Sequence, residues 1–167
     1  MKILLALSQS EASEAAMNFL MSQMAVRGTE LRLLYVLDPY PERLATRMGS
    51  DDAPDFTSAR RKQLELGEKL VSQATEQLSS AGFAVTSSIK EGDVEALIIE
   101  EAKRWRADLI VVGWRERKGI RSLFSANISE DVSRYAPCSV MVVRTPPWVR
   151  GFSCSCTGES ALTSSAA

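Results

Sequence analysis

Five short apolar runs, several of them rich in β-branched residues, recur along the first 145 residues of the chain. They are Ile3–Leu7, Leu31–Leu37, Phe83–Ile89, Leu109–Val112 and Val140–Val143. Most of the segments between them carry apolar residues at every third or fourth position, which is the period of an amphipathic helix. This alternation predicts a doubly wound α/β domain, with a five-stranded, mainly parallel sheet and helices on both faces.

The helical pattern is clearest in three segments. Their apolar positions are Ala16, Leu20 and Met24; Leu66, Leu70, Ala74 and Leu78; and Val94, Ile98 and Ala102. Among the strands, Leu109–Val112 and Val140–Val143 are continuously apolar, which predicts burial on both faces, whereas Phe83–Ile89 alternates with polar residues and is the expected edge strand. Asp93 is expected to cap the third of these helices.

Two segments have little of this patterning. Asp38–Asp55 contains three prolines and is expected to form a long, polar loop. Beyond Pro146 and Pro147, the chain consists mainly of Ser, Ala, Thr and Gly. Such a composition cannot offset the entropy lost when the backbone is ordered. We therefore expect one α/β domain over residues 1–145 and a disordered C-terminal tail over residues 146–167.

Composition narrows the range of functions. The 167 residues include no histidine, which excludes Ser-His-Asp and Cys-His nucleophile systems and the common zinc sites. The 20 basic and 21 acidic side chains give a net charge of −1, so no basic field favours nucleic acid or an anionic membrane. Three cysteines are too few for a secreted disulfide scaffold, and no apolar run approaches the length of a membrane span. A cytoplasmic protein without a bound metal is expected.

The first candidate site is the loop after the first apolar run, because ligands of open parallel sheets bind beyond the carboxyl ends of the strands. Ser8 and Glu11 have the spacing of a capping box in which Ser8 is the N-cap of the next helix. The alternative is a hydroxyl-lined phosphate cradle, of the kind that a flavin mononucleotide protein uses. The charge of Glu11 and the absence of glycine argue against that alternative.

A second candidate site follows the fourth run, between Gly113 and Asn127. Four cations precede the last expected helix, and a helix start is a place where an anion can bind. They are Arg115, Arg117, Lys118 and Arg121. Solvated surface charges are the alternative interpretation. Asn127 is expected to cap the last helix, with Glu130 three residues on. Ser8 and Val36, which lies near the end of the second run, complete the candidate ligand site.

From Lys2 to Arg144 the chain resembles the universal stress protein family. Separate blocks carry the resemblance, in the order in which the family has them: Ile3-Leu4-Leu5-Ala6-Leu7-Ser8-Gln9-Ser10-Glu11, Gly113-Trp114-Arg115-Glu116, Gly119-Ile120-Arg121, Ala126-Asn127-Ile128-Ser129-Glu130 and Ala136-Pro137-Cys138-Ser139-Val140. The resemblance implies the strand order 3-2-1-4-5. It also implies a homodimer that pairs through the last strand, with an interface formed by Val140, Met141, Val142 and Val143.

The same resemblance indicates where this chain departs from nucleotide-binding members of the family. Those members carry an aspartate after the first strand and a Gly-x2-Gly-x9-Gly-Ser/Thr motif that holds the phosphates. The matching positions here are Ser8 for the aspartate and Gly113, Glu116, Ala126 and Asn127 for the motif, of which only Gly113 agrees. Glu116 places a negative charge at the polyphosphate site, which disfavours ATP or AMP as a cofactor.

We therefore expect a non-catalytic stress-response protein with a binding or regulatory role, no cofactor, and a protein client as a further partner. Two alternatives stay open. One is an adenine-nucleotide-binding member of the family. The other is a flavodoxin-like or adenine-nucleotide α-hydrolase-like enzyme, although Ser8–Ser13 lacks the glycines of the hydrolase loop. Residual affinity is expected for a simple anion at Gly113–Asn127.

Overall fold

The computed structural model describes residues 1–24, 27–38, 56–114 and 128–144. The elements follow one another as β1 (Lys2–Leu7), α1 (Glu11–Gln23), β2 (Glu30–Leu37), α3 (Phe56–Ser80), β3 (Ala84–Glu91), α4 (Val94–Trp105), β4 (Leu109–Gly113), α5 (Ile128–Tyr135) and β5 (Ser139–Val143). Strands and helices alternate, as the hydrophobic pattern predicts. The expected loop over residues 39–55 and the expected tail over residues 146–167 lie outside the described residues.

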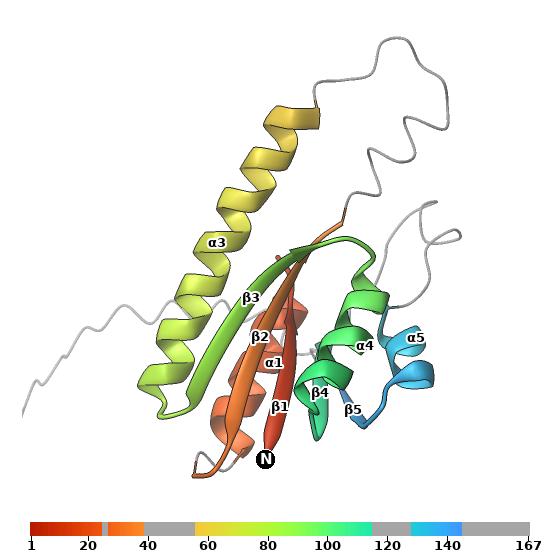
Figure 1. Ribbon diagram of the computed structural model, residues 1–167. Helices are drawn as coiled ribbons and strands as arrows, with labels where there is room; N and C mark the ends of the chain where they lie inside the picture. Colours follow the sequence, from red (N-terminus) through yellow and green to blue (C-terminus); the bar gives the residue numbers. More distant parts are fainter. Residues whose placement is uncertain (25–26, 39–55, 115–127, 145–167) are drawn as a thin grey trace, which may run out of the picture.

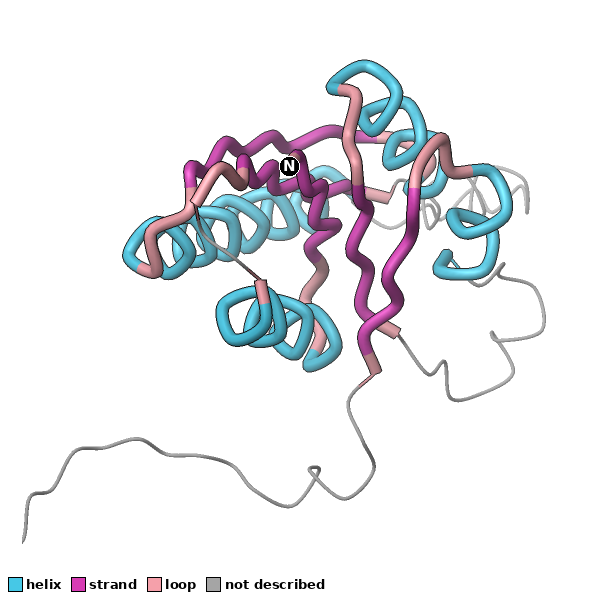
Figure 2. Tube along the Cα trace, turned by 90° about the horizontal axis from the view of Figure 1, so that it is seen from below, coloured by secondary structure: helices cyan, strands magenta, loops and turns pink. Residues whose placement is uncertain are grey.

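The five strands form one parallel sheet in the order β3-β2-β1-β4-β5. The chain moves outward from β1 twice, once toward β3 and once toward β5. Because parallel crossovers are right-handed, α1 and α3 cover one face of the sheet and α4 and α5 cover the other (Figures 1 and 2). The predicted doubly wound fold and strand order are confirmed.

Each face of the sheet carries its own hydrophobic core. Side chains alternate along β1, so that Ile3 and Leu5 enter the core under α1 and α3, whereas Leu4 enters the core under α4 and α5. All three are fully buried. When both faces of a strand are buried, the residues on both faces are apolar, so the strand appears in the sequence as a continuous apolar run.

The predictions for the two edge strands of the sheet have different outcomes. β3 lies at one edge, as its alternating pattern predicts. The prediction that Val140–Val143 is buried on both faces holds only in part. Alternate residues of β5 pack against the two cores, but all four are only partly buried, because β5 forms the opposite edge. An apolar run does not distinguish a central strand from an apolar edge strand.

The core-facing stripe of α3 differs from the predicted one. Leu66 is 42% exposed, and the buried stripe is Gly67, Val71, Ala74 and Leu78. Each residue turns a helix by about 100°, so a strict spacing of four places Leu66 about 120° around the helix from Leu78, whereas Gly67 lies about 20° from it. The first turns of α3 also extend past the end of the sheet (Figure 1), where no strand lies beneath them.

The helix α4 begins as predicted. The Asp93 carboxylate accepts a hydrogen bond from the Ala96 N–H at 2.9 Å, which makes Asp93 the N-cap. The helix ends at Arg106 in the left-handed conformation, with φ +55°. A non-glycine residue in this conformation closes the last turn through its N–H, which donates to the carbonyls of Ala102 and Lys103.

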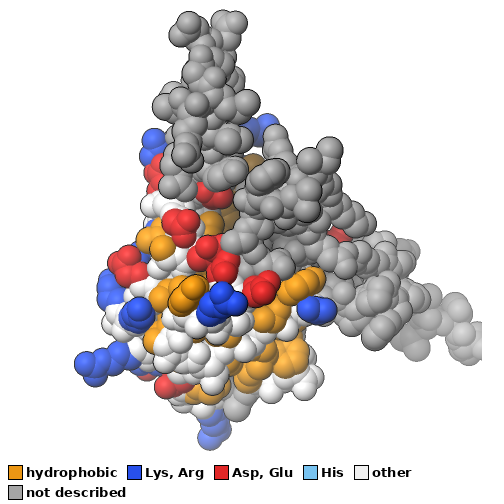
Figure 3. Space-filling model, turned by 90° about the vertical axis from the view of Figure 1, so that its right-hand side faces the viewer, with side chains coloured by type: hydrophobic (Ala, Val, Ile, Leu, Met, Phe, Trp, Pro, Cys, Tyr) orange, Lys and Arg blue, Asp and Glu red, His pale blue; other side chains and the backbone are white. Residues whose placement is uncertain are grey.

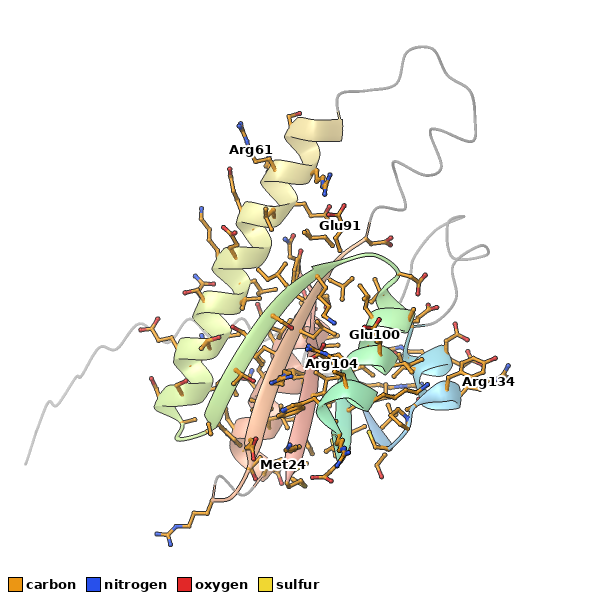
Figure 4. The ribbon with its side chains drawn as sticks, in the orientation of Figure 1. Met24, Arg61, Glu91, Glu100, Arg104 and Arg134 are labelled. Atoms are coloured by element: carbon orange, nitrogen blue, oxygen red, sulfur yellow. The ribbon has the colours of Figure 1, made fainter. Side chains whose placement is uncertain are left out.

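A buried carboxylate fixes α4 to the sheet. The side chain of Glu101 is fully buried, and one of its oxygens lies 2.9 Å from Arg32 Nη1 of β2. Its second oxygen lies 2.7 Å from Lys90 Nζ of β3 and 2.6 Å from Arg104 Nη2 of α4. Arg104, which is labelled on α4 in Figure 4, is largely exposed and reaches Glu101 from the solvent side of the cluster. Burial opposes ionisation of Glu101, but the hydrogen bonds from Arg104, Lys90 and Arg32 outweigh it and lower its pKa to about 2.

Trp105 extends this cluster by stacking against cations. The guanidinium carbon of Arg32 lies 4.6 Å from the centre of the Trp105 ring, and Lys2 Nζ of β1 lies 5.5 Å from it. Such contacts hold a cation in place beyond the effect of its ion pair. Strands β1, β2 and β3 are thus all connected to α4 through charged side chains.

We expect Glu101→Gln to destabilise the protein by about 2–3 kcal/mol at pH 7, because the amide keeps the shape of Glu101 but leaves three cations without their counter-charge. The pKa of Glu101 is lower in the folded state than in the unfolded state. Its contribution to stability is therefore fully present above the unfolded-state pKa of about 4.5, and it is lost as the pH falls toward about 2. Urea denaturation at pH 7 and at low pH measures both effects.

The control for this prediction is Glu100→Gln, since Glu100 is the exposed neighbour on α4. It should change the free energy of unfolding by less than about 0.5 kcal/mol. If Glu101→Gln loses as much stability on acidification as the parent protein does, the ion cluster is not the source of the pH dependence.

Candidate functional site

The site predicted from the sequence lies where β1 and β4 are neighbours. The chain leaves β1 toward β2 on one side, whereas β4 continues toward β5 on the other, so the strand order reverses between them. Ligands of doubly wound folds bind at the carboxyl ends of the strands at this point. The described residues there are the segment from Ser8 to Ser13 and the end of β4 at Gly113.

Three serines form a closed hydrogen-bond network at the start of α1. The Ser8 N–H donates to Ser13 Oγ at 3.0 Å, and the hydroxyls of Ser8 and Ser10 share a hydrogen bond of 2.9 Å. Ser10 Oγ also accepts from the Ser13 N–H at 3.3 Å. Ser13 is buried, whereas Ser8 and Ser10 are partly exposed.

The expected capping box with Ser8 as the N-cap is therefore wrong, because Ser10 is the N-cap of α1. The Ser10 N–H donates to the Ser8 carbonyl at 2.9 Å, so the chain turns once more before the helix begins at Glu11. Ser13 is the third residue after the N-cap, whose side chain commonly bonds back to the backbone before the helix. Here the Ser13 hydroxyl accepts the hydrogen bond of the Ser8 N–H. Sequence spacing cannot distinguish these two registers, since serines occur at both positions.

Gln9 connects this turn to β2. Its side-chain amide donates to the hydroxyl of Tyr35 at 3.3 Å. Burial raises the pKa of Tyr35, and the hydrogen bond from Gln9 only partly opposes that effect. Tyr35 lies against Gly67, where a side chain would overlap the aromatic ring, so the absence of a side chain in α3 makes room for the tyrosine. None of these contacts is evident from the sequence.

Gly113 brings the two loops together. A Cβ at this position would lie 2.5 Å from the carbonyl carbon and oxygen of Ala12, in the first turn of α1. Glycine therefore permits the start of α1 to pack directly on the end of β4. Next to it, the Trp114 N–H donates to the Val143 carbonyl at 2.7 Å, and Arg144 stacks on the Trp114 ring at 3.8 Å.

The other predicted site residues have different outcomes. Val36 packs against the core under α4, which gives it a structural contact, and it is only partly buried. The remaining five candidates, Arg115, Arg117, Lys118, Arg121 and Asn127, lie outside the described residues. The anion site and the capping role of Asn127 thus stay predictions. Of the predicted site residues, Gly113 packs against Ala12 in the first turn of α1, and Ser8 precedes that turn.

The described residues offer little for metal or thiol chemistry. They contain no group of three His, Cys, Asp or Glu side chains that could hold a metal ion. Burial raises the pKa of the Cys138 thiol, and the nearby charge of Asp108 adds to the shift, so the reactive thiolate is disfavoured. None of the helices in the described part of the chain is long and apolar enough to cross a membrane.

Comparison with known proteins gives consistent results. The model of the universal stress protein family matches residues 1–144. A universal stress protein of Thermus aquaticus is 29% identical over 143 residues, which cover 85% of this chain and 97% of the relative. A second relative, the universal stress protein Sll1388 of Synechocystis, is 26% identical over 149 residues, covering 86% of this chain and 97% of the relative.

Solved structures share the fold. A universal stress protein family protein of Arabidopsis thaliana, with AMP bound, has a TM-score of 0.63 at 20% identity and covers 88% of this chain and 93% of its own. The Archaeoglobus fulgidus universal stress protein in complex with dAMP has a TM-score of 0.58 at 18% identity, with coverage of 86% and 97%. At these identities the likeness concerns the fold alone.

The packing at Gly113 leads to a prediction. Gly113→Ala should destabilise the protein by about 1–3 kcal/mol, because the new Cβ must displace the first turn of α1. Urea denaturation measures the change in stability, and amide NMR shifts should concentrate on the Ser8–Ser13 segment. Adding Ala12→Gly should not restore stability, since two of the three atoms in the way belong to the backbone of residue 12. A variant as stable as the parent would contradict this account of Gly113.

Proposed function

Because this chain belongs to the universal stress protein family, we propose that it is a non-catalytic protein with a binding or regulatory role in a stress response. The observation that carries the proposal is the closed serine network at the end of β1. Ser8 occupies the position of the ligand-holding aspartate of nucleotide-binding relatives, and its hydroxyl is hydrogen-bonded to Ser10. In the described part of the site, the three serines thus satisfy one another by hydrogen bonds.

The chemistry of the site supports a role without catalysis. A serine nucleophile needs an adjacent base, and the chain has no histidine to provide one. Among the described residues, the Ser8 hydroxyl is hydrogen-bonded to the Ser10 hydroxyl, which is not a base. Glu11 and Glu14 in the first turn of α1 stabilise the helix by opposing its dipole.

A second candidate function is the binding of a nucleoside monophosphate. The relatives with AMP and dAMP bound favour it. A single phosphate also carries less charge toward the position of Glu116 than a triphosphate does, and like charges repel more strongly as their number grows. Because a hydroxyl has one donor and two acceptor sites, Ser8 Oγ can contact such a ligand while it keeps its hydrogen bond with Ser10.

Calorimetric titration tests both functions. We expect Mg-ATP to bind more weakly than about 100 μM, which corresponds to about −5.5 kcal/mol. The triple variant Ser8→Asp, Glu116→Gly, Ala126→Gly restores the family's ligand-holding residues and should gain at least about tenfold in affinity for Mg-ATP, or about 1.4 kcal/mol. Low-micromolar binding of Mg-ATP to the parent protein would overturn the expectation. Micromolar binding of AMP alone would favour the second candidate.

We further propose that two copies pair through β5. The strand lies at an edge of the sheet, contains no charged residue, and has Val140–Val143 partly exposed. An apolar edge without a partner is an aggregation hazard, and a two-fold axis places the same strand of a second copy against it. Figure 3, viewed from the side of α5, shows hydrophobic side chains gathered in patches on the described surface.

Val142→Lys tests this pairing. The change places two like charges at the proposed two-fold interface, and we expect the variant to be monomeric by light scattering at concentrations where the parent is a dimer. Ala84→Lys, on the exposed opposite edge at β3, is the matched control and should leave the mass unchanged. Circular dichroism verifies that both variants fold. An unchanged mass for Val142→Lys would reject β5 as the interface.

A further inference from the structure

The open edge of β3 is a second unpaired strand, and it differs in kind from β5. All eight residues of β3 pair with β2 on one side. Within the described part of the chain no strand pairs with its other side. Ala84–Glu91 contains no proline, so its outward N–H groups are intact. An edge of this length is a template for an additional strand.

A groove of about 500 Å³ runs between this strand and α3. Among its lining residues are Glu68, Ser72, Thr75 and Glu76 of α3 and Ser87 and Ile89 of β3. It takes in residues of β3 but none of β2, so it lies at the outer part of the sheet, on the face that α3 covers. At one end, Arg60 of α3 forms an ion pair with Glu91, which lies beside α3 at the end of β3 (Figure 4). That ion pair joins the start of α3 to the end of β3 through side chains that are both partly exposed.

The groove is acidic, and this charge favours a basic occupant. Glu68 and Glu76 are both exposed, and no Lys or Arg lines the groove. Neither carboxylate takes part in an ion pair among the described residues. They are eight residues apart on α3, which places them about 12 Å apart along the helix and about 80° apart around it. The side chains of an extended strand at positions i and i+4 are about 13 Å apart and lie on the same face.

We propose that the open edge of β3 binds an extended segment of another protein as an additional strand, with basic side chains four residues apart facing Glu68 and Glu76. A small or β-branched residue between them would face Val71 and Ile89, the apolar part of the groove. The backbone of the segment supplies affinity through the strand hydrogen bonds, and the two carboxylates supply specificity.

A second copy of this chain fits the same edge poorly. Pairing of two β3 strands about a two-fold axis would place the two acidic grooves next to each other. Like charges at an interface disfavour the wrong partner. The two edges of the sheet therefore have different partners, with the uncharged β5 suited to self-association and the β3 edge suited to a basic segment. This inference does not rest on the proposed function.

Labelled peptides test the proposal by fluorescence anisotropy with the full chain. The first probe is a peptide of about eight residues, the length of β3, with lysine at two positions four apart and threonine or valine elsewhere. The second probe has glutamate in place of each lysine. The third keeps the lysines but has prolines that remove strand hydrogen bonds. Only the first should bind, and its amide NMR shifts should map to Ala84–Glu91 and to the groove side of α3.

The double variant Glu68→Lys, Glu76→Lys should weaken binding of the first peptide by about tenfold or more, because two attractive pairs become repulsive. The matched control is Glu14→Lys, Glu100→Lys, which changes the net charge equally at exposed positions of α1 and α4 and should bind like the parent.

Equal binding of the lysine and glutamate peptides, binding of the proline peptide, shifts centred on β5, or no saturation by about 1 mM would each overturn the proposal. Concentration-dependent shifts of Ala84–Glu91 without peptide would identify a second copy as the occupant and would overturn it as well.

Discussion

The burial of β1 between β2 and β4 is the constraint on which the rest of the molecule depends. The side chains of Ile3, Leu4 and Leu5 each pack into one of the two cores and are fully buried from solvent. A strand with both faces buried must have helices on both sides, and right-handed crossovers then determine which helices lie where. The same burial places the end of β1 at the reversal of strand order, so the hydrophobic core itself determines the position of the candidate site.

The ion cluster at Glu101 has a different part in the fold from that of the two cores. The face of β3 that points toward α4 is polar, with Thr86, Ser88 and Lys90, and so it cannot bury apolar surface under that helix. Glu101 connects Lys90 and Arg32 to α4 by charge instead. An edge strand held by charge on one face and by α3 on the other keeps its polar outer edge in solvent. Since breaking a buried ion pair costs more than forming it gains, the arrangement favours one placement of α4 over its alternatives.

The sequence predicts the strands, their order of succession and the first edge, because hydrophobic alternation depends on burial alone. It predicts less where two geometries share one pattern. Serines at positions 8 and 10 both satisfy a capping pattern, and only the extra turn at Ser8 selects Ser10. The Glu101 cluster joins residues 69 positions apart in the chain, so no local pattern indicates it. The contact of Gly113 with Ala12 also depends on the packing of two elements, although the glycine itself is found from the family's motif.

The serine network determines what a ligand at the end of β1 would have to do. The hydrogen bond between Ser8 and Ser10 contributes only about 0.5–1.5 kcal/mol in net terms, so a ligand that offers an equivalent partner loses little by replacing it. The buried Ser13 is different, because its hydroxyl accepts from the Ser8 N–H and its own N–H is satisfied by Ser10. Displacing Ser13 would leave buried polar groups without partners, which costs more than the bond contributes. A ligand at the end of β1 can therefore exchange with the outer hydroxyls of Ser8 and Ser10 more readily than it can enter the turn held by Ser13.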